Sequence, residues 1–258
     1  MSRLNRLKLV IKTSGFLGLF TFLIARILGQ SDLIRPASTV DIRRAGIAFS
    51  HDVRSFVKSL VGEFESHLSD ELILEARQIN AEIEARTKDA HHFFPENWNS
   101  EEQLRIALYL LVRIFKPELV VETGTANGSS AAAICAGLSA NRSGILVSVD
   151  VKDSSAILVS ESHRDFLLLR KTGGSDKELR EICSSASAKY SGFKIFLHDS
   201  DHSYFGQYSD YKTAEDLGFN LVLSDDVDAS LAFTDFAGKA GVALFDTRKI
   251  IGGVIVKN

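Results

Sequence analysis

Two aspartates and a histidine follow directly on a buried-looking apolar run in the stretch FLHDSDHSYFGQYSDY. Asp199, Asp201 and His202 all lie just past the point where this run ends. A second acidic pair, Asp225 and Asp226, ends the apolar run FNLVLSDD. Carboxylates bind cations and an imidazole accepts a proton near neutral pH, so these side chains have the chemistry of a reactive site if their strands are neighbours.

Three of these carboxylates would meet at one edge of a sheet if the two apolar runs are adjacent strands. Like charges crowded together are costly unless a cation neutralises them. Oxygen ligands suit a hard divalent ion, Mg²⁺ first, with Mn²⁺ or Ca²⁺ as alternatives. We therefore predict one divalent cation held by Asp199, Asp225 and Asp226. His202 would accept the proton of a substrate hydroxyl held against this metal, which lowers the pKa of the hydroxyl.

Each of these residues also has a purely structural interpretation. Asp199 and Asp201 have the side chains to cap the helix expected from about Tyr204. The acidic pair at 225–226 would make a solvated turn before the next helix, and a single histidine is more often structural than catalytic. The order of the signals along the chain favours the reactive site, and Asp201 has no defined role in it.

The elements that would position these side chains begin after residue 98. Ser100 and Gln103 fit a capping box at the start of a helix that Pro117 ends. Strands and helices then alternate, with strands expected at LVVET, GILVSVDV, DFLLLR, FKIFLHD and FNLVLSDD. The final segment, VALFDTRKIIGGVIVKN, predicts two strands joined by a turn, which would add an antiparallel edge strand. Such alternation predicts a mostly parallel sheet with helices on both faces and a ligand at the carboxyl ends of its strands.

A glycine-containing turn follows the first strand, in VVETGTANGSS. Gly124 and Gly128 would let the backbone turn sharply and approach a ligand without a Cβ in the way. Their spacing is not the G-x-G-x-x-G of dinucleotide-binding turns. Glu122 is instead similar to the acidic position of class I methyltransferases, which bind S-adenosylmethionine (SAM). The alternative is an ordinary turn between a strand and a helix.

Asp150 ends the next strand and could accept both ribose hydroxyls of an adenosine group, because a carboxylate offers two acceptor oxygens. The same position serves NAD, so it supports an adenosine ligand without choosing one, and a surface acid is the structural alternative. Together with the glycine turn it predicts a cofactor site made of Glu122, Gly124, Thr125, Gly128, Ser129 and Asp150.

Four segments together carry a resemblance to known enzymes: VVETGTANGSS, VSVDV, FLHDSDHSYFGQYSDY and LVLSDDV. They resemble the SAM-dependent methyltransferases called methyltransferase family 24, the metal-dependent macrolide-sugar O-methyltransferases and the cephalosporin-hydroxylase-like proteins. The resemblance covers about residues 100–258. It implies an α/β fold with a Rossmann-like class I methyltransferase sheet, mostly parallel with an antiparallel C-terminal hairpin, preceded by an N-terminal helical extension.

The resemblance also implies roles for individual residues. A family pattern close to D-G-D-H-S-Y matches residues 199–204, with Ser200 in place of the glycine. By this match Asp199 is the first metal ligand, His202 is the general base, and the acidic pair at 225–226 completes the metal site. The acid that usually follows the third strand and contacts adenine is missing, with Asp176 as a weak candidate. Thr125 and Asn127 stand where smaller residues are common.

The implied function is O-methylation of a hydroxyl on a sugar or another small molecule, with SAM and a divalent cation, most simply Mg²⁺, as cofactors. A metal-independent methyltransferase that uses His202 alone is one alternative. A protein that keeps the SAM fold without turnover, and acts as a binding or scaffold protein at a membrane, is another. The acceptor is not specified by the sequence.

The chain divides into three segments on this interpretation: a hydrophobic N-terminal segment (1–30), a helical lead-in (31–98) and the methyltransferase domain (99–258). Basic residues precede the apolar run SGFLGLFTFLIA, which is shorter than the ~20 residues of a confident membrane span. Residues 1–29 could pack as a helix on the protein or a partner, lie on a membrane surface or anchor there marginally, or be a cleaved signal.

The composition narrows the cellular setting. The formal net charge of −3 gives no overall basic field, so nucleic acid is not an expected partner. Two cysteines do not suggest a disulfide framework, which fits a reducing compartment and a cytoplasmic protein, membrane-associated through its N-terminus if the apolar run binds lipid. The composition does not decide the oligomeric state, and a homo-oligomer is one alternative.

Overall fold

A computed structural model of the protein describes residues 35–91, 93–153 and 156–256. Its strands are β1 (Ala48–Ser50), β2 (Leu119–Thr123), β3 (Ile145–Asp150), β4 (Leu167–Lys171), β5 (Lys194–His198), β6 (Leu221–Ser224), β7 (Val242–Asp246) and β8 (Lys249–Ile255). Its α-helices are α2 (Thr39–Arg44), α3 (Val53–Val61), α4 (Asp70–Asp89), α5 (Glu102–Phe115), α6 (Ser129–Asn141), α7 (Asp176–Ser187), α8 (Tyr204–Asp216) and α9 (Ala232–Ala237). Shorter 3₁₀ turns are η2 (Gly62–His67), η3 (Glu96–Trp98), η4 (Glu161–Phe166) and η5 (Gly238–Ala240).

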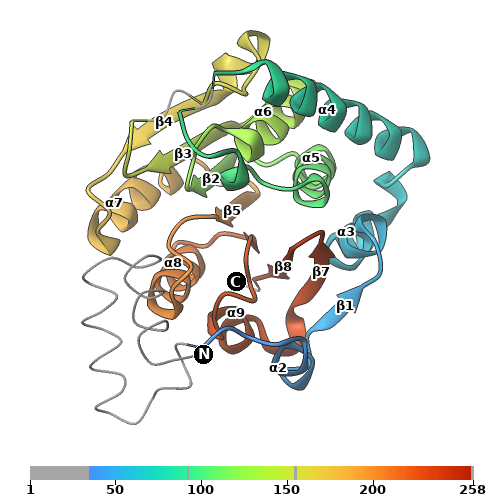
Figure 1. Cartoon of the computed structure of the whole chain (residues 1–258), viewed down its shortest axis with the longest axis vertical. Helices are drawn as coiled ribbons and strands as arrows, with labels where there is room; N and C mark the ends of the chain where they lie inside the picture. The colour runs from blue at the N-terminus through green and yellow to red at the C-terminus, as the bar shows by residue number, and fades with distance from the viewer. Residues whose placement is uncertain (1–34, 92, 154–155, 257–258) are drawn as a thin grey trace.

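The described strands form one eight-stranded sheet in the order β1-β7-β8-β6-β5-β2-β3-β4 (Figure 1). Neighbouring strands are parallel except where β8 pairs with β6 and with β7. The predicted fold class, a mostly parallel α/β sheet with an antiparallel C-terminal hairpin, is confirmed.

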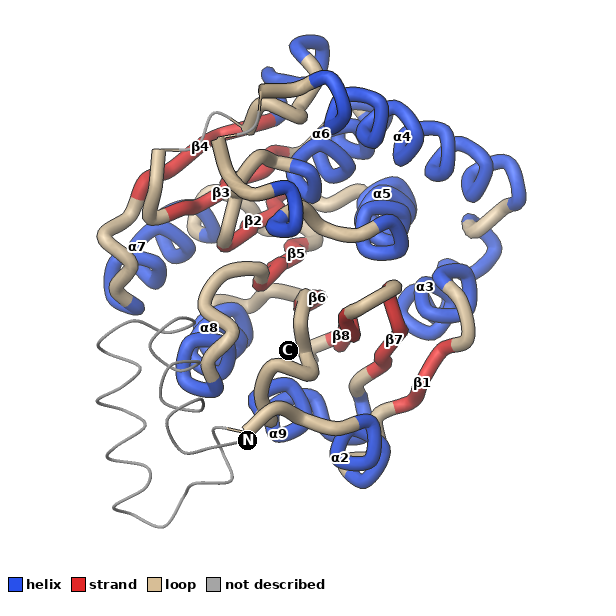
Figure 2. Tube along the Cα trace, viewed as in Figure 1, coloured by secondary structure: helices blue, strands red, loops and turns tan. Residues whose placement is uncertain are grey.

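Helices cover both faces of this sheet, as Figure 2 shows. Helices α3 to α6 pack on one face, and α2, α7, α8 and α9 pack on the other. Because successive side chains of a strand point to opposite faces, Val120 belongs to the first hydrophobic core and its neighbours Leu119 and Val121 belong to the second. Burial on both sides explains why the strands are continuous apolar runs in the sequence.

Strand β2 lies at the switch point of the sheet. The chain runs from β2 to β3 and β4 on one side, then crosses back to β5 on the other side. Thr123, the last residue of β2, is therefore paired both with Val149 of β3 and with His198 of β5. Ligands of such sheets bind outside the carboxyl ends of the strands at this point, so the segments that follow β2, β3 and β5 define the region to inspect.

The lead-in is not helical throughout, and the prediction was wrong at residues 48–50. Gly46, with a φ of +84°, follows helix α2, and Ala48–Ser50 then pairs in parallel with β7 as the edge strand β1. The three residues of β1 carry too short a pattern to be distinguished from helix, so pairing with β7 decides their conformation.

The predicted position of the C-terminal hairpin was also wrong, because β8 lies between β6 and β7 and not at the edge.

The start of helix α5 also differs from the prediction. Glu101, and not Ser100, is the N-cap residue, and its side chain makes no capping hydrogen bond. The backbone N–H of Leu104 donates instead to the Asp246 carboxylate at the end of β7, at 2.8 Å. A tertiary contact therefore replaces the predicted capping box.

The predicted hydrophobic segment 1–30 lies outside the described residues, so association with a membrane through residues 1–29 stays a prediction. Within 35–91, 93–153 and 156–256, no helix is both long and apolar enough to cross a bilayer.

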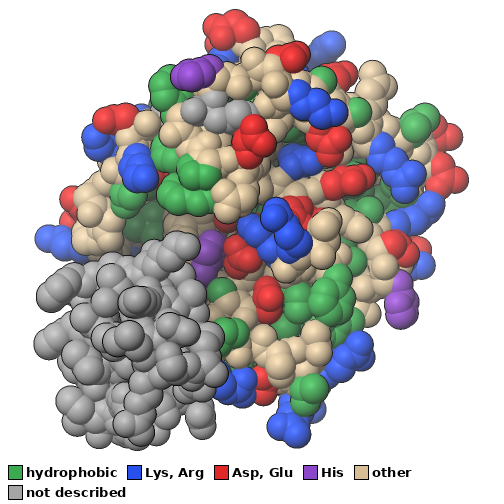
Figure 3. Space-filling view, viewed as in Figure 1, with side chains coloured by type: hydrophobic (Ala, Val, Ile, Leu, Met, Phe, Trp, Pro, Cys, Tyr) green, Lys and Arg blue, Asp and Glu red, His purple; other side chains and the backbone are tan. Residues whose placement is uncertain are grey.

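On the face shown in Figure 3, Lys and Arg side chains are interspersed with Asp and Glu side chains.

Candidate active site

The turn after β2 is in direct contact with the segment after β5. Gly124 has a φ of +87°, and a Cβ there would lie 1.8 Å from the carbonyl oxygen of Asp199. The backbone N–H of Asp199 in turn donates to the carbonyl of Thr123 at 3.0 Å. Gly128, with a φ of +86°, similarly faces the Cα of Ala156, at 2.8 Å from an added Cβ. The glycines were predicted to make room for a ligand, but the nearest atoms to their missing Cβ positions belong to the chain itself.

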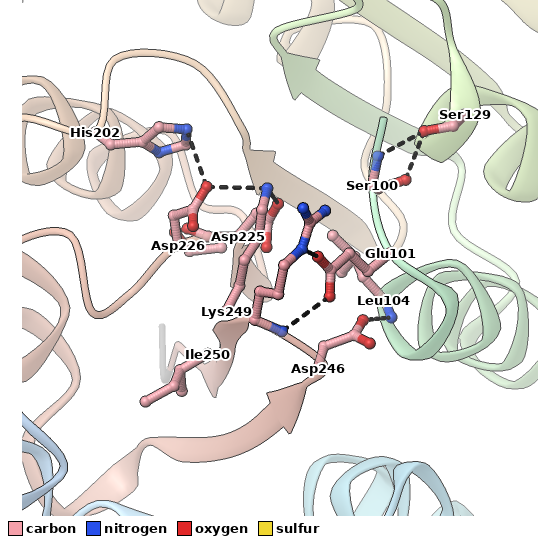
Figure 4. Close-up of polar contacts among 12 residues, drawn as sticks. Ser100, Glu101, Leu104, Ser129, His202, Asp225, Asp226, Asp246, Lys249 and Ile250 are labelled. Carbon is pink, nitrogen blue, oxygen red and sulfur yellow. Dashed lines mark hydrogen bonds and ion pairs between the residues drawn. The ribbon is translucent and has the colours of Figure 1, made fainter. Parts of the chain in front are cut away.

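His202, from the segment after β5, lies beside Asp226, which follows β6, at this edge of the sheet (Figure 4). The backbone N–H of Asp225 donates to the carbonyl of His198 at 3.0 Å, which extends the β5–β6 pairing beyond the strands. One ligand atom from each of Asp199, His202 and Asp226 lies within 4.8 Å of the others. The sequence predicted three aspartates as ligands with His202 beside them, whereas this grouping takes His202 in place of Asp225.

Lys249, the first residue of β8, is a site residue that sequence reasoning missed. Its Nζ lies 2.8 Å from Oδ2 of Asp225 and 3.1 Å from Oδ2 of Asp226. Because β8 runs antiparallel to β6, the first residue of β8 lies at the edge where β6 ends. The sequence does show a lysine at the start of the last strand. Placing this lysine beside the acids after β6 requires the strand order, which the sequence does not give.

Crowding and burial change the pKa values of these groups. Burial and then the charge of Asp225 raise the pKa of Asp199 well above its usual range. Burial likewise raises the pKa of Asp225 to about 6, although Lys249 opposes the change. For Lys249 itself, burial lowers the pKa, but Asp225 and Asp226 outweigh it and raise the pKa overall. The ammonium group is therefore held in its charged form.

The surroundings of His202 favour its neutral form. Burial lowers its pKa to about 4, His198 adds to this, and Asp226 opposes it. Its Nε2 lies 3.3 Å from Oδ2 of Asp226. Next to it the ring of His198 is fully buried, with Nδ1 2.7 Å from Oδ2 of Asp210. A neutral imidazole can ligate a cation or accept a proton, so both roles suit His202.

Glu122 lies beneath the glycine turn and is completely buried. Its Oε2 accepts a hydrogen bond from the Ser148 hydroxyl, and its Oε1 has no hydrogen-bond partner among the described residues. Burial raises its pKa to about 7, although the neighbouring Ser130 and Ser148 hydroxyls act to lower it. An unpaired buried carboxylate oxygen is costly, and a cationic group of a ligand close by would stabilise it.

Asp150 is fixed beside the glycine turn at the end of β3. Its Oδ2 accepts from the backbone N–H of Ala126 and its Oδ1 from that of Lys152, each at 2.9 Å. Each oxygen keeps further acceptor capacity for a hydroxyl group. A pocket of about 190 Å³ opens here, lined by Thr125, Asp150, Lys152, Asp153, Leu169, Arg170 and Lys171.

Other residues of the predicted cofactor site are bonded within the protein. The Thr125 hydroxyl lies 2.7 Å from that of Ser148, and the Ser129 hydroxyl accepts from the backbone N–H of Ser100 at 2.7 Å. Asp176, the weak candidate for the adenine contact, accepts from the Ser209 hydroxyl at 2.7 Å and does not line the pocket beside Asp150.

Residues 93–99 of the lead-in lie against the glycine turn, which the sequence did not indicate. Asn127 accepts from the backbone N–H of Phe94 at 3.2 Å and donates to the carbonyl of Phe94 and to Asn99 Oδ1, both at 3.1 Å. Lys152 Nζ lies 5.5 Å from the ring centre of Phe94 and 5.0 Å from that of Trp98. Asn127 is an amide where smaller residues are common, but this difference does not say which segment the side chain binds.

The chain is similar to known proteins in its fold. No protein-family pattern and no curated protein matches it. The O-methyltransferase TomG from Streptomyces achromogenes, involved in tomaymycin synthesis and solved with SAM, aligns with a TM-score of 0.50 at 16% identity, over 73% of this chain and 91% of that chain. A methyltransferase of Podospora anserina bound to S-adenosylhomocysteine (SAH) gives 0.48 at 15% identity, over 74% and 89%. An O-methyltransferase of Bacillus cereus in complex with SAH gives 0.46 at 18%, over 72% and 91%.

The strand order and the TomG alignment define a Rossmann-like class I methyltransferase fold. At this level of identity the likeness concerns the fold alone. The narrower resemblance to methyltransferase family 24, to the macrolide-sugar enzymes and to the cephalosporin-hydroxylase-like proteins stays a prediction.

Proposed function

We propose that this protein is a SAM-dependent methyltransferase that methylates a hydroxyl of a sugar or another small molecule. The observation that carries this proposal is a contact at the switch point of the sheet. The glycine turn after β2, residues 124–128, packs there on the acidic segment after β5, residues 199–202. A donor bound at the turn and an acceptor bound at Asp199, His202 and Asp226 would lie next to each other, because Gly124 packs on the backbone of Asp199. Methyl transfer needs this proximity of its two substrates.

SAM would be held by the residues around the turn. Asp150 would bind the ribose hydroxyls in the adjoining pocket. The unpaired Oε1 of buried Glu122 suits a cationic ligand, as the amino and sulfonium groups of SAM are. The remaining predicted residues would fix the shape of the turn and would not bind SAM through their side chains: Gly124, Thr125, Gly128 and Ser129. The hydroxyl groups of Thr125 and Ser129 are already hydrogen-bonded within the protein.

The acceptor hydroxyl would meet the acidic cluster. Asp199 and Asp226, with Asp225 or His202 as the third group, have the donor atoms for a divalent cation. Such an ion, when bound, lowers the pKa of a hydroxyl that contacts it. With Asp225 as the third group, His202 stays free of the ion, and we then assign to it the acceptance of the hydroxyl proton, because burial favours its neutral ring.

A second candidate is a methyltransferase that needs no metal. Lys249 favours it, because its ammonium group already contacts two of the three carboxylates. A cation supplied by the chain would then orient the acceptor, with His202 as the base.

The first test is SAM binding by isothermal calorimetry, with NAD as the competitor. Asp150→Ala should weaken SAM binding by about 10- to 150-fold, the equivalent of about 1.5–3 kcal/mol for hydrogen bonds to a charged group. Asp176→Ala is the matched control and should leave the affinity unchanged, because Asp176 bonds to Ser209 away from the pocket. Preference for NAD, or equal SAM affinity in wild type and Asp150→Ala, would contradict the placement of the cofactor.

Methyl transfer itself is tested by the release of SAH from SAM when sugars and other small hydroxyl compounds are added, with Mg²⁺ and with EDTA. Turnover that EDTA abolishes supports the metal-assisted reaction, and turnover in EDTA supports the second candidate. Tight SAM binding without release of SAH from any acceptor would favour a binding protein that has kept the fold.

A further inference from the structure

The acidic cluster already contains a positive charge from the chain. Figure 4 shows the Lys249 side chain directed at the two aspartates that follow β6. The Asp225 side chain is 2% exposed and that of Lys249 18% exposed, so this ion pair is largely removed from water. Desolvation offsets much of the attraction in a buried pair of this kind, but removal of one partner leaves the other charge buried and uncompensated.

The backbone on both sides of Lys249 is held in place. On one side, the backbone N–H of Arg248 donates to Oε2 of Glu101 at 3.2 Å, and Arg248 Nε donates to Oε1 at 2.9 Å. On the other side, the N–H of Ile250 donates to Oδ1 of Asp228 at 3.1 Å, and its carbonyl accepts from Val227 at 2.9 Å. The turn before β8 is thus tied to the start of α5 and to the loop after β6. Lys249 therefore has little freedom to leave the acids by moving its backbone.

One carboxylate oxygen, Oδ2 of Asp226, is within reach of both the Lys249 ammonium group and a divalent ion at the predicted metal site. Oδ2 of Asp226 lies 3.1 Å from Lys249 Nζ, and it also lies 3.3 Å from Nε2 of His202, in the group formed with Asp199. A magnesium ion bound to such an oxygen would sit about 2.0–2.1 Å from it. The ammonium group and the ion would then be close neighbours, and their charges would repel.

We propose that Lys249 is the resident cation of this cluster, and that a divalent ion binds at Asp199 and Asp226 only in competition with its ammonium group. The inference rests on the proposed function for its expectation that a divalent ion binds here. The competition itself is a property of cation binding and does not require methyl transfer. Lys249 is accordingly a residue that sets the metal requirement of the site.

The test is calorimetric titration of Mg²⁺ and Mn²⁺ into the full chain and its variants. Lys249→Met removes the charge and keeps a side chain of similar length, and it should bind either ion at least about tenfold more tightly than wild type. Lys249→Arg keeps the charge and should bind like wild type. Lys239→Met, on the exposed turn Gly238–Ala240, is the control for loss of one positive charge elsewhere, and should also bind like wild type.

Thermal unfolding gives a second, independent measurement. Lys249→Met leaves buried Asp225 without its partner, so it should melt below wild type without metal, and Mg²⁺ or Mn²⁺ should raise its melting temperature more than that of wild type. If Lys249→Met does not fold without metal, Lys249→Gln keeps a hydrogen-bond donor for Asp225 and takes its place in both experiments.

Equal affinity for the ions in wild type, Lys249→Met and Lys249→Gln would overturn the competition, and so would the absence of binding in all three. SAM affinity is measured on the same samples. Loss of SAM binding in every protein would contradict the proposed function while leaving the comparison of cation affinities valid.

Discussion

At the scale of single residues, the most unusual group outside the acidic cluster is the Glu122 carboxyl. It is fully buried, one of its oxygens has no hydrogen-bond partner among the described residues, and burial raises its pKa to about 7. The sequence placed an acid here by analogy with a cofactor contact. Its burial beneath the glycine turn, on which its chemistry depends, follows from the pairing of Glu122 with Ser148 across β2 and β3.

We predict that Glu122 makes the stability of the protein fall as the pH rises from about 4.5 to about 7. A group whose pKa is raised on folding keeps its proton in the folded protein at pH values where the unfolded chain has lost it. Its contribution to stability is therefore complete below the pKa of the unfolded chain, and it is lost as the pH rises to the pKa of the folded protein. For a change from 4.5 to about 7 the loss is about 3 kcal/mol.

Urea unfolding of wild type and Glu122→Gln at pH 5 and pH 7.5 measures this effect. The other buried carboxyls are common to both proteins, so the difference between their unfolding free energies isolates Glu122. Wild type should lose more stability than the variant between the two pH values. A difference that does not vary with pH would mean that Glu122 is not protonated in the folded state.

At the scale of elements, the sequence predicted those parts that a local pattern determines. The strands around Val120 and Phe196 were located because burial on both faces makes them apolar throughout. Strand β1 was missed because only three residues form it and because its partner β7 is about 190 residues away in the chain.

The same distinction explains the candidate site. The convergence of Asp199 and Asp226 could be predicted because both follow neighbouring parallel strands. Lys249 could not be predicted, because its place depends on the insertion of β8 between β6 and β7, which the hairpin pattern leaves undetermined. The clamp of Asn127 on Phe94 likewise joins segments that no local pattern connects.

The contact between the turn after β2 and the segment after β5 predicts a large cost for Gly124→Ala. Two penalties add: a positive φ of +87° that L-residues rarely adopt, and a Cβ that would lie 1.8 Å from a backbone oxygen of Asp199. Gly174→Ala is a matched control, because Gly174 has nearly the same φ, +84°, and its added Cβ meets only the side chain of Val151, at 3.0 Å.

Chemical unfolding of both variants separates the two penalties. Gly174→Ala should lose about 1–2 kcal/mol from backbone strain. Gly124→Ala should lose that amount and roughly 1–3 kcal/mol more, because the backbone of the segment after β5 must move. Equal losses in the two variants would mean that the turn and the acidic segment are not in close contact, which would weaken the case for one shared site.

At the scale of the whole molecule, the described residues cover both faces of the sheet with their own helices. The eight strands come from residues 48–255, and the helices on both faces close two hydrophobic cores over them. The lead-in belongs to this unit, since β1 extends the sheet, α3 and α4 pack on the core of α5, and Asn127 binds the segment 93–99. Residues 1–29 lie outside this described unit, so their role needs a separate test.

We predict that removal of residues 1–29 releases the protein from membranes without changing its fold. Arg3, Arg6, Lys8 and Lys12 precede the apolar run of 14–25. Each basic residue near an anionic membrane surface contributes about 1 kcal/mol of attraction, and the apolar run adds burial among the lipid chains. In cell fractionation, the full chain should sediment with membranes and the shortened chain should remain in the supernatant, with the same melting temperature and SAM affinity. A full chain found entirely in the supernatant, together with a lower melting temperature after the deletion, would instead make residues 1–29 part of the folded core.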